Sequence, residues 1–413
     1  MKADARPPEF KARTITSLGS IKAAAWNACA FSGEGLDSAA GPLAADPANP
    51  FVSHEFLAAL ETSGCVGPST GWDPVHVIIE TADGTLAACA PCYLKSHSQG
   101  EYVFDHSWAD AYQRAGGSYY PKLQVAAPFS PVTGPRLLVR GGETAARQAL
   151  IGALKELRRQ SQVSSLHVTF ADADDASALA ESGFLRRCDQ QFHWLNEGYS
   201  NFDNFLAALA SRKRKAIKRE RRDALGSGIT IETLTGRDIT EAHWHAFFGF
   251  YMDTGSRKWG RPYLTRTFFT EIGAKMAERI VLIMARREGR YIAGAINLLG
   301  RHTLYGRNWG CIEDHPFLHF EVCYYQAIEF AITRKLRRVE AGAQGEHKLA
   351  RGYQPVMTHS AHDFSDPGFR RAVADFLKRE GGYVAAAKQE LVQHLPFRQP
   401  SALAAPGDPS QID

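Results

Sequence analysis

A cluster of ionisable and polar side chains lies in the C-terminal part of the sequence. Its members are Glu340, Gln344, His347, Lys348 and Arg351. Acyl transfer to an amine needs a group that accepts the amine proton, and Glu340 or His347 suits this catalytic task. It also needs a positive group beside the carbonyl oxygen, which Lys348 can supply. The cluster therefore predicts an acyl-transfer site, in which Gln344 and Arg351 would bind substrate. A capped helix with a charged outer surface is the alternative.

Two strand-like runs are expected to position this cluster. Residues 303–309 and 338–341 have the composition of strands, and residues 319–335 between them carry apolar residues every three or four positions, as an amphipathic helix does. A right-handed crossover through this helix would set the two strands side by side and parallel. Ligands usually bind where parallel strands end. The sequence therefore predicts a slot between the strand ends. Its lining would be Arg307, Glu340 and His347.

Aromatic residues lie in and before the first of these strands. Trp259, Tyr263, Tyr305 and Trp309 are predicted to line a pocket between the two halves of the molecule and to stack on an acceptor. The neighbouring Lys258 is also predicted to bind substrate, as a cation that would reach the same ligand as the basic run at residues 211–222. Packing in the core explains at least half of these aromatic residues equally well.

The segment between residues 96 and 122 is unusually rich in polar and aromatic groups. Those predicted to bind the acceptor are His97, Glu101, Asp105, His106, Tyr120 and Lys122. Such a density of polar groups suits a pocket wall better than a core. A metal site is disfavoured because no closely spaced pair of histidines is present. A rigid polar loop that satisfies its own hydrogen bonds is the alternative.

A run of basic residues lies near the middle of the chain. Within residues 211–222, the cations cover every face of a predicted helix. This pattern favours contact with phosphate, such as that of tRNA, a nucleotide-sugar or a lipid headgroup. The predicted phosphate-binding residues are Arg212, Lys213, Arg214 and Lys215. A solvated helix between domains, with its charges partly paired, is the alternative.

The composition is typical of a soluble globular protein. Of the 413 residues, 44% are hydrophobic and 22% are charged, and the formal net charge is +4. The charge of the whole molecule therefore indicates no class of partner. The seven cysteines lie in apolar settings, which favours reduced thiols in a cytoplasmic protein over a metal or redox role for Cys89 and Cys92. No apolar run is long enough to span a bilayer.

The length of the chain favours two domains, and the order of predicted elements agrees. Both halves run helix, hairpin, strand, helix, strand, helix, strand, which predicts a mixed α/β (α+β) protein. The predicted domains are residues 15–198, here called the first half, and residues 199–397, the second half. The second half opens with a basic helix over residues 205–225. The two ends of the chain, residues 1–14 and 398–413, are predicted to be disordered.

Four longer strings resemble a known family. They lie at residues 93–106, 119–122, 257–263 and 340–353, the last reading Glu-Ala-Gly-Ala-Gln-Gly-Glu-His-Lys-Leu-Ala-Arg-Gly-Tyr. The chain resembles the bacterial FemAB-like proteins of peptidoglycan biosynthesis from about residue 15 to about residue 397. This resemblance implies two tandem GNAT-like N-acyltransferase domains, each with a mixed, partly parallel sheet flanked by helices.

The resemblance also implies an activity. It implies transfer of an acyl or aminoacyl group to an amine of a peptidoglycan or other envelope precursor, with acyl-CoA or aminoacyl-tRNA as co-substrate and no tightly bound cofactor or metal. The loop that would hold the coenzyme A pyrophosphate keeps Arg307 and Gly310, but Ile312 replaces its last small residue and Asp314 follows. This departure supports the alternative of a catalytically silent module that binds a nucleotide-sugar or another phosphorylated ligand.

Overall fold

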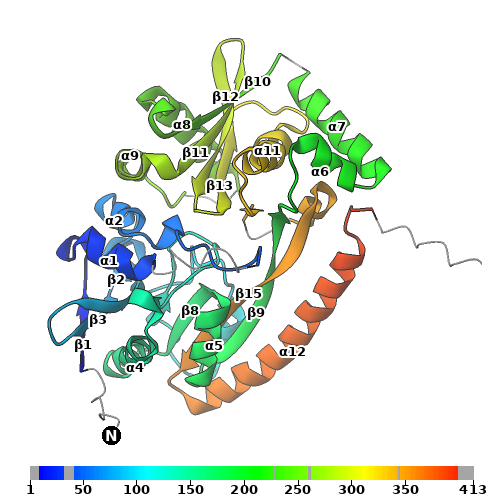
Figure 1. Ribbon diagram of the computed structural model, residues 1–413. Helices are drawn as coiled ribbons and strands as arrows, with labels where there is room; N and C mark the ends of the chain where they lie inside the picture. Colours follow the sequence, from blue (N-terminus) through cyan, green and yellow to red (C-terminus); the bar gives the residue numbers. More distant parts are fainter. Residues whose placement is uncertain (1–8, 32–40, 227, 259–261, 343–344, 399–413) are drawn as a thin grey trace, which may run out of the picture.

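The computed structural model describes most of the chain (Figure 1). The described residues are 9–31, 41–226, 228–258, 262–342 and 345–398, without the side chains of Lys258 and Glu346. Among them, no helix is both long enough and apolar enough to cross a membrane.

A large sheet runs through both halves of the protein. In spatial order its strands are β10 (Thr230–Thr235), β11 (Ile280–Arg287), β12 (Arg290–Leu299), β13 (Thr303–Cys311), β14 (Arg338–Glu340), β9 (Leu185–Leu195), β15 (Tyr353–Phe364), β8 (Ser165–Ala171), β6 (Lys122–Val125), β5 (Cys92–Lys95) and β2 (Trp72–Pro74). A smaller sheet holds β1 (Phe10–Ile15), β3 (His76–Thr81), β4 (Leu86–Ala90) and β7 (Leu138–Val139). Each half contributes one parallel pair, β6 with β8 and β13 with β14, as the predicted mixed sheets require.

The two halves exchange their last strands. Strand β9 belongs to the first half in sequence, yet it pairs with β14 of the second half. Strand β15 belongs to the second half, yet it pairs with β8 of the first. The exchanged strands also pair with each other over ten positions, from Tyr353↔Trp194 to His362↔Leu185. The halves therefore share one continuous set of backbone hydrogen bonds.

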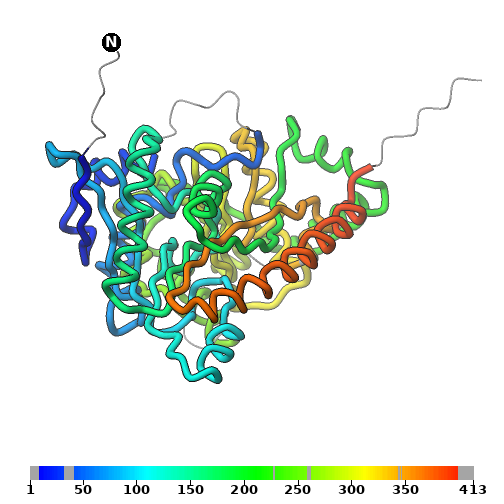
Figure 2. The backbone as a smooth tube through the Cα atoms, turned by 90° about the horizontal axis from the view of Figure 1, so that it is seen from below, coloured from blue at the N-terminus to red at the C-terminus, as the bar shows by residue number. Residues whose placement is uncertain are grey.

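Helices cover the sheets on both sides (Figure 1). They are α1 (Ala23–Ala30), α2 (His54–Thr62), α3 (His106–Arg114), α4 (Thr144–Gln160), α5 (Ala173–Glu181), α6 (Phe202–Ala208), α7 (Ser211–Leu225), α8 (Glu241–Lys258), α9 (Arg266–Lys275), α10 (Leu318–Phe320), α11 (Gln326–Thr333) and α12 (Pro367–Gln393). Helix α2 of the first half packs against α9 of the second, where the rings of Phe56 and Phe268 lie 5.7 Å apart. Figures 1 and 2 show α12 running beside the exchanged strands β9 and β15.

Some elements differ from the sequence prediction. The helix expected over residues 205–225 is two helices, because Leu209 and Ala210 adopt extended backbone angles between α6 and α7. The crossover helix contains a π-helical turn, Glu321–Tyr325, between α10 and α11. Residues 10–14, placed in the disordered N-terminus by the sequence, belong to β1 and pair with β3. The segment between residues 96 and 122 contains α3.

Candidate functional site

Strands β13 and β14 pair in parallel and then separate. Their pairing runs from Thr303↔Arg338 to Tyr305↔Glu340, which confirms the predicted neighbouring parallel strands. Strand β14 ends there, whereas β13 continues beside β12 as far as Cys311. The backbone of β13 beyond Tyr305 therefore has no β14 partner on that side. Parallel sheets usually bind ligands at strand ends of this kind.

A β-bulge lies at this point of β13. The register between Ala295↔Trp309 and Asn297↔Gly306 places Arg307 and Asn308 opposite a single residue of β12. An extra residue reverses the alternation of side chains along a strand. Arg307 accordingly faces the first half, and its guanidinium donates to the Phe129 carbonyl over 2.7 Å. Trp309 instead lies beside His319, with ring centroids 5.3 Å apart.

Glu340 is buried and holds one ion pair. Its Oε1 accepts from Arg338 Nε over 2.9 Å, and Arg338 also donates to the carbonyl of Ala44 over 2.6 Å. Its Oε2 is buried without a hydrogen-bond partner and lies 3.8 Å from His193 Nε2. Burial raises the pKa of Glu340, although the charge of Arg338 opposes this shift. A carboxylate with a raised pKa is a stronger proton acceptor than a solvated one.

Lys348 is buried beside the end of β14. Only 2% of its surface is exposed, and Nζ donates to the Gly342 carbonyl over 3.1 Å. Burial lowers the pKa of Lys348 to about 8, and the positive charge of Arg307 acts in the same direction. Burial likewise lowers the pKa of Arg307, which feels the opposite charge of Glu340. The charge of Arg307 therefore interacts with those of both Lys348 and Glu340, and these three residues are here called the strand-end site.

His347 is placed differently from the prediction. Its ring is exposed and its Nε2 lies 2.9 Å from the Tyr324 hydroxyl. Within the described part of the chain, no hydrogen bond or ion pair joins His347 to Glu340 or Arg307. Arg351, on the same turn, donates to the His347 carbonyl over 2.7 Å and packs over the Phe320 ring. His347 therefore lies apart from the other two members of the predicted trio, whereas the charge of Lys348 interacts with that of Arg307.

The space beside Arg307 is small. A cavity of about 20 Å³ touches Arg307 and Asn308, and most of its other lining is aromatic or aliphatic side chains from both halves. A cavity of this size holds about one water molecule and is too small for a substrate. Phe129 covers Arg307, and the Tyr263 ring stacks on Phe129 at 4.9 Å.

The predicted aromatic pocket is not assembled from the residues that the structure describes. Tyr305 is fully buried and packs edge-on against Phe51, with ring centroids 5.4 Å apart. Tyr263 is partly exposed, and Trp309 lies on the other face of β13. The predicted residues Lys258 (side chain), Trp259 and Gln344 lie outside the described part.

The charged residues between 96 and 122 form a buried cluster instead of a pocket wall. Lys122 Nζ donates to Glu101 Oε2 and Ser98 Oγ, each over 2.8 Å, and to Asp105 Oδ2 over 2.5 Å. The Tyr119 hydroxyl also donates to Asp105, over 2.6 Å. Burial raises the pKa of Glu101 to about 7. Burial alone would also raise the pKa of Asp105, but the Lys122 charge outweighs it and holds that pKa well below its usual value.

The other three residues of this segment lie around the cluster. The Tyr120 hydroxyl is 2.8 Å from Ser98 Oγ, and His97 Nε2 is 3.0 Å from the Thr70 carbonyl. His106 is exposed at the start of α3. The segment thus satisfies much of its own polarity internally, as the alternative interpretation expected.

We expect Lys122→Met to destabilise the protein strongly. Removing one partner of a buried ion cluster leaves uncompensated charge and costs roughly 3–5 kcal/mol. Urea unfolding at pH 7 should show this loss. Without the cation, the Glu101 and Asp105 pKa values rise in the folded state above their unfolded values. The folded variant then takes up protons as the pH falls, and the deficit should shrink on acidification.

The exposed Lys218→Met serves as the matched control and should change the free energy of unfolding little. Equal stability of Lys122→Met and the parent at pH 7 would contradict the cluster's structural role.

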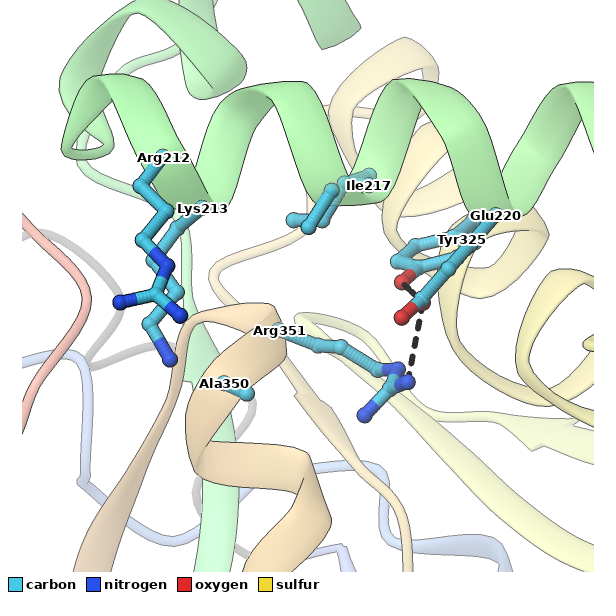
Figure 3. Close-up of a pocket in the computed structure, with 8 residues that line it drawn as sticks. Arg212, Lys213, Ile217, Glu220, Tyr325, Ala350 and Arg351 are labelled. Atoms are coloured by element: carbon cyan, nitrogen blue, oxygen red, sulfur yellow. Dashed lines mark hydrogen bonds and ion pairs between the residues drawn. The ribbon is translucent and has the colours of Figure 1, made fainter.

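The basic residues of α7 are largely exposed. Arg212, Lys213 and Lys215 face solvent and Arg214 is half-buried. Arg212 and Lys213 line a cavity that Arg351 also borders, whereas Arg214 and Lys215 do not line it (Figure 3). The structure therefore brings three predicted binding residues together at a place separate from the strand-end site.

A further pocket of about 380 Å³ follows β13. Its lining is Thr254, Arg257, Trp309, Cys311, Glu313, Asp314, His315, Pro316, Phe317, Leu318, His319 and Phe320. Arg287, Arg290 and His315 surround the Glu313 carboxylate, and hydrogen bonds to them help to lower its pKa to about 2. The loop around Ile312 and Asp314, which departs from the coenzyme A pattern, therefore borders this cavity, and the Glu313 carboxylate lies in the cavity wall.

Sequence reasoning missed two residues of the site. Arg338 shares a strand face with Glu340 two positions away, and this spacing could have identified it as the carboxylate's partner. His193 comes from β9, which reaches the site only through the strand exchange. No local pattern in the sequence signals that placement.

The fold and the opened parallel pair define a protein with two tandem GNAT-like halves. The chain belongs to the FemAB_like family, described as peptidoglycan biosynthesis/recognition, whose model matches residues 17–399. The fold and the family that the sequence motifs predicted are therefore confirmed. A search of curated proteins gave no match.

Comparison with solved structures gave matches at low sequence identity. The crystal structure of FemX has a TM-score of 0.53 and 12% identity, and the match covers 86% of this chain and 98% of FemX. A tandem GNAT protein from the clavulanic acid biosynthesis pathway has a TM-score of 0.46 and 13% identity, over 87% of this chain and 99% of that one. L-PGS from Bacillus licheniformis has a TM-score of 0.47 and 10% identity, over 86% and 99%. At 12% identity the likeness to FemX concerns the fold alone.

Proposed function

We propose that this protein is an N-acyltransferase that moves an acyl or aminoacyl group from a thioester or a tRNA ester to an amine of an envelope precursor. The observation that carries the proposal is the strand-end site, where a buried lysine and a buried carboxylate with opposed pKa shifts lie beside the separated strands β13 and β14. Paired ionisable groups of this kind are characteristic of catalytic sites. Membership of a family linked to peptidoglycan biosynthesis or recognition supports the acceptor class.

The proposed reaction is a direct transfer. The amine nitrogen attacks the carbonyl carbon of the donor, the new C–N bond forms, and the C–S or C–O bond to the carrier breaks. Glu340 accepts the proton that the amine loses and passes it to the carrier, which leaves as a thiol or hydroxyl. The Lys348 ammonium stabilises the negative charge on the carbonyl oxygen. Arg307 holds a negative group of the donor, which requires the segment around Phe129 to move from its present contact with Arg307.

Glu340→Gln should reduce turnover about hundredfold, because the amide cannot accept the amine proton. His347→Ala should change turnover little, since the exposed imidazole makes its contacts away from Glu340. Both variants would be measured in a purified transfer assay, with donors identified by mass spectrometry of co-purifying ligands. Unchanged turnover in Glu340→Gln would remove the proposed base.

Glu321→Gln is the matched control for this experiment. Glu321 is also fully buried and paired with an arginine, Arg221, but it contacts α7 and not the strand ends. A comparable loss of stability with full turnover in this control would separate catalysis from folding.

A second candidate function is binding without catalysis. The cavity under α7 favours it, because its cations suit a nucleotide-sugar or another phosphorylated ligand. The same transfer assay separates the candidates: a silent module binds precursor and forms no product with any donor.

A further inference from the structure

The cavity under α7 has the charge of an anion site (Figure 3). It measures about 370 Å³ and is lined by Arg212, Lys213, Ala216, Ile217, Glu220, Tyr325, Ala350 and Arg351. Figure 3 shows Arg212 and Lys213 pointing down from the start of α7, whereas the Arg351 side chain extends away from them toward Glu220 and Tyr325. Three cations therefore face a space that contains one carboxylate.

That carboxylate is already occupied. Glu220 accepts from Arg351 Nη2 over 2.9 Å and from the Tyr325 hydroxyl. The side chains of Arg212 and Lys213 form no hydrogen bond or ion pair with another residue in the described ranges. The side of the cavity under the first turn of α7 thus carries uncompensated positive charge.

The start of α7 is electrostatically unfavourable without a ligand. Its N-cap, Ala210, provides no side-chain hydrogen bond, and its first turn contains no acidic residue. The first turn instead carries Arg212, Lys213 and Arg214, although the helix dipole makes that end positive. An anion bound beside this turn would offset both effects.

Arg351 supplies the buried half of the site. It is 6% exposed, and its guanidinium lies over the Phe320 ring at 3.4 Å. Its Nη1 donates to the His347 carbonyl, while its buried Nε has no partner. Arg351 and Lys348 belong to the same 3-10 turn, Glu346–Arg351, so one turn borders both the cavity and the strand-end site.

The cavity is larger than a phosphate group and partly apolar. Ala216, Ile217 and Ala350 line it together with the Tyr325 ring. Pockets of this size bind small molecules that combine an apolar ring with a few polar anchors. The cations of this cavity suit a phosphate group, and its apolar lining suits a ring system attached to that phosphate.

We infer that this cavity binds a nucleoside phosphate, with the phosphate on Arg212, Lys213 and Arg351 and the nucleoside against Ile217 and Tyr325. The inference deepens the proposed function, since the ligand would be the nucleotide part of the activated donor or of the acceptor. Because Arg351 and Lys348 belong to the same 3-10 turn, a ligand bound at Arg351 would influence the position of Lys348.

The test is calorimetric titration of the full-length protein with AMP, adenosine and ribose 5-phosphate. AMP should bind, ribose 5-phosphate should bind more weakly, and adenosine should show no measurable binding. Replacing both Arg212 and Lys213 by alanine should weaken AMP binding roughly tenfold or more, because charge-assisted hydrogen bonds to phosphate are lost. Both side chains are exposed, so the variant should keep its melting temperature.

The matched control is the double variant Lys218→Ala and Arg219→Ala. It removes the same charge from exposed positions of α7 that do not line the cavity, and it should bind AMP like the parent. The inference is wrong if AMP does not bind, if adenosine binds as well as AMP, or if both double variants lose the same affinity. Binding is measured without turnover, so failure of the transfer assay leaves this test intact.

Discussion

Lys348→Met should lower the rate of acyl transfer by about two to three orders of magnitude, the usual effect of removing one oxyanion donor. Methionine fills a similar volume, so the buried site should stay packed, while the positive charge beside the end of β14 is lost. The effect should appear in kcat more than in KM, because the negative charge on the carbonyl oxygen develops in the transition state. Steady-state kinetics with a fixed donor would measure it.

The pH dependence of the rate distinguishes the proposed role of Lys348, stabilising the oxyanion, from a role as the base. If its ammonium stabilises the oxyanion, the rate should fall as the pH rises through about 8, where the pKa of Lys348 lies. In Lys348→Arg the cation persists, so some activity should return and the fall above pH 8 should disappear. A rate that rises through pH 8, with no activity in Lys348→Arg, would show that the lysine acts as a base.

The sequence was sufficient to predict the parallel pairing of β13 with β14, but not the faces on which the side chains of β13 lie. The apolar period of the crossover helix and the short strand-like runs around it were sufficient to place β13 beside β14. The β-bulge at Arg307 and Asn308 could not be predicted from the alternation of polar and apolar residues in the sequence. It moved Trp309 to the opposite face from Arg307, and this is why the predicted aromatic pocket was not found among the described residues.

Burial of charged side chains explains another difference between the sequence prediction and the structure. Sequence reasoning assigned Glu101, Asp105 and Lys122 to a pocket wall, because isolated charges are costly in a core. In the structure Lys122 forms ion pairs with both Glu101 and Asp105, and only the three-dimensional arrangement reveals this pairing. The predicted order of elements ends the second half with a strand, but no residue range was predicted for it. This strand is β15, whose buried positions include Thr358, Ser360 and His362, so the segment lacks the apolar signature of a buried strand.

Separating the chain between residues 198 and 199 should prevent either half from folding alone. The second half would lose β9, leaving β14 without one of its two neighbours, and the first half would lose β15 beside β8. Trp194 and Phe192 of β9 pack in the core of the second half and would be exposed. Unpaired strand edges and exposed aromatic residues favour aggregation. Each fragment expressed alone should therefore be insoluble or lack a cooperative unfolding transition.

Co-expression of the two fragments is the control, because it restores every strand pair without restoring the peptide bond. The fragments should then co-purify as a one-to-one complex and unfold in one cooperative transition, since the paired β9 and β15 connect both cores. Circular dichroism during urea unfolding would follow this. A cooperative transition in the isolated fragment 199–413 would show that its sheet is stable without β9. The exchanged strands would then join two independent domains, and coupling between the halves would depend more on other contacts, such as those of α2 with α9.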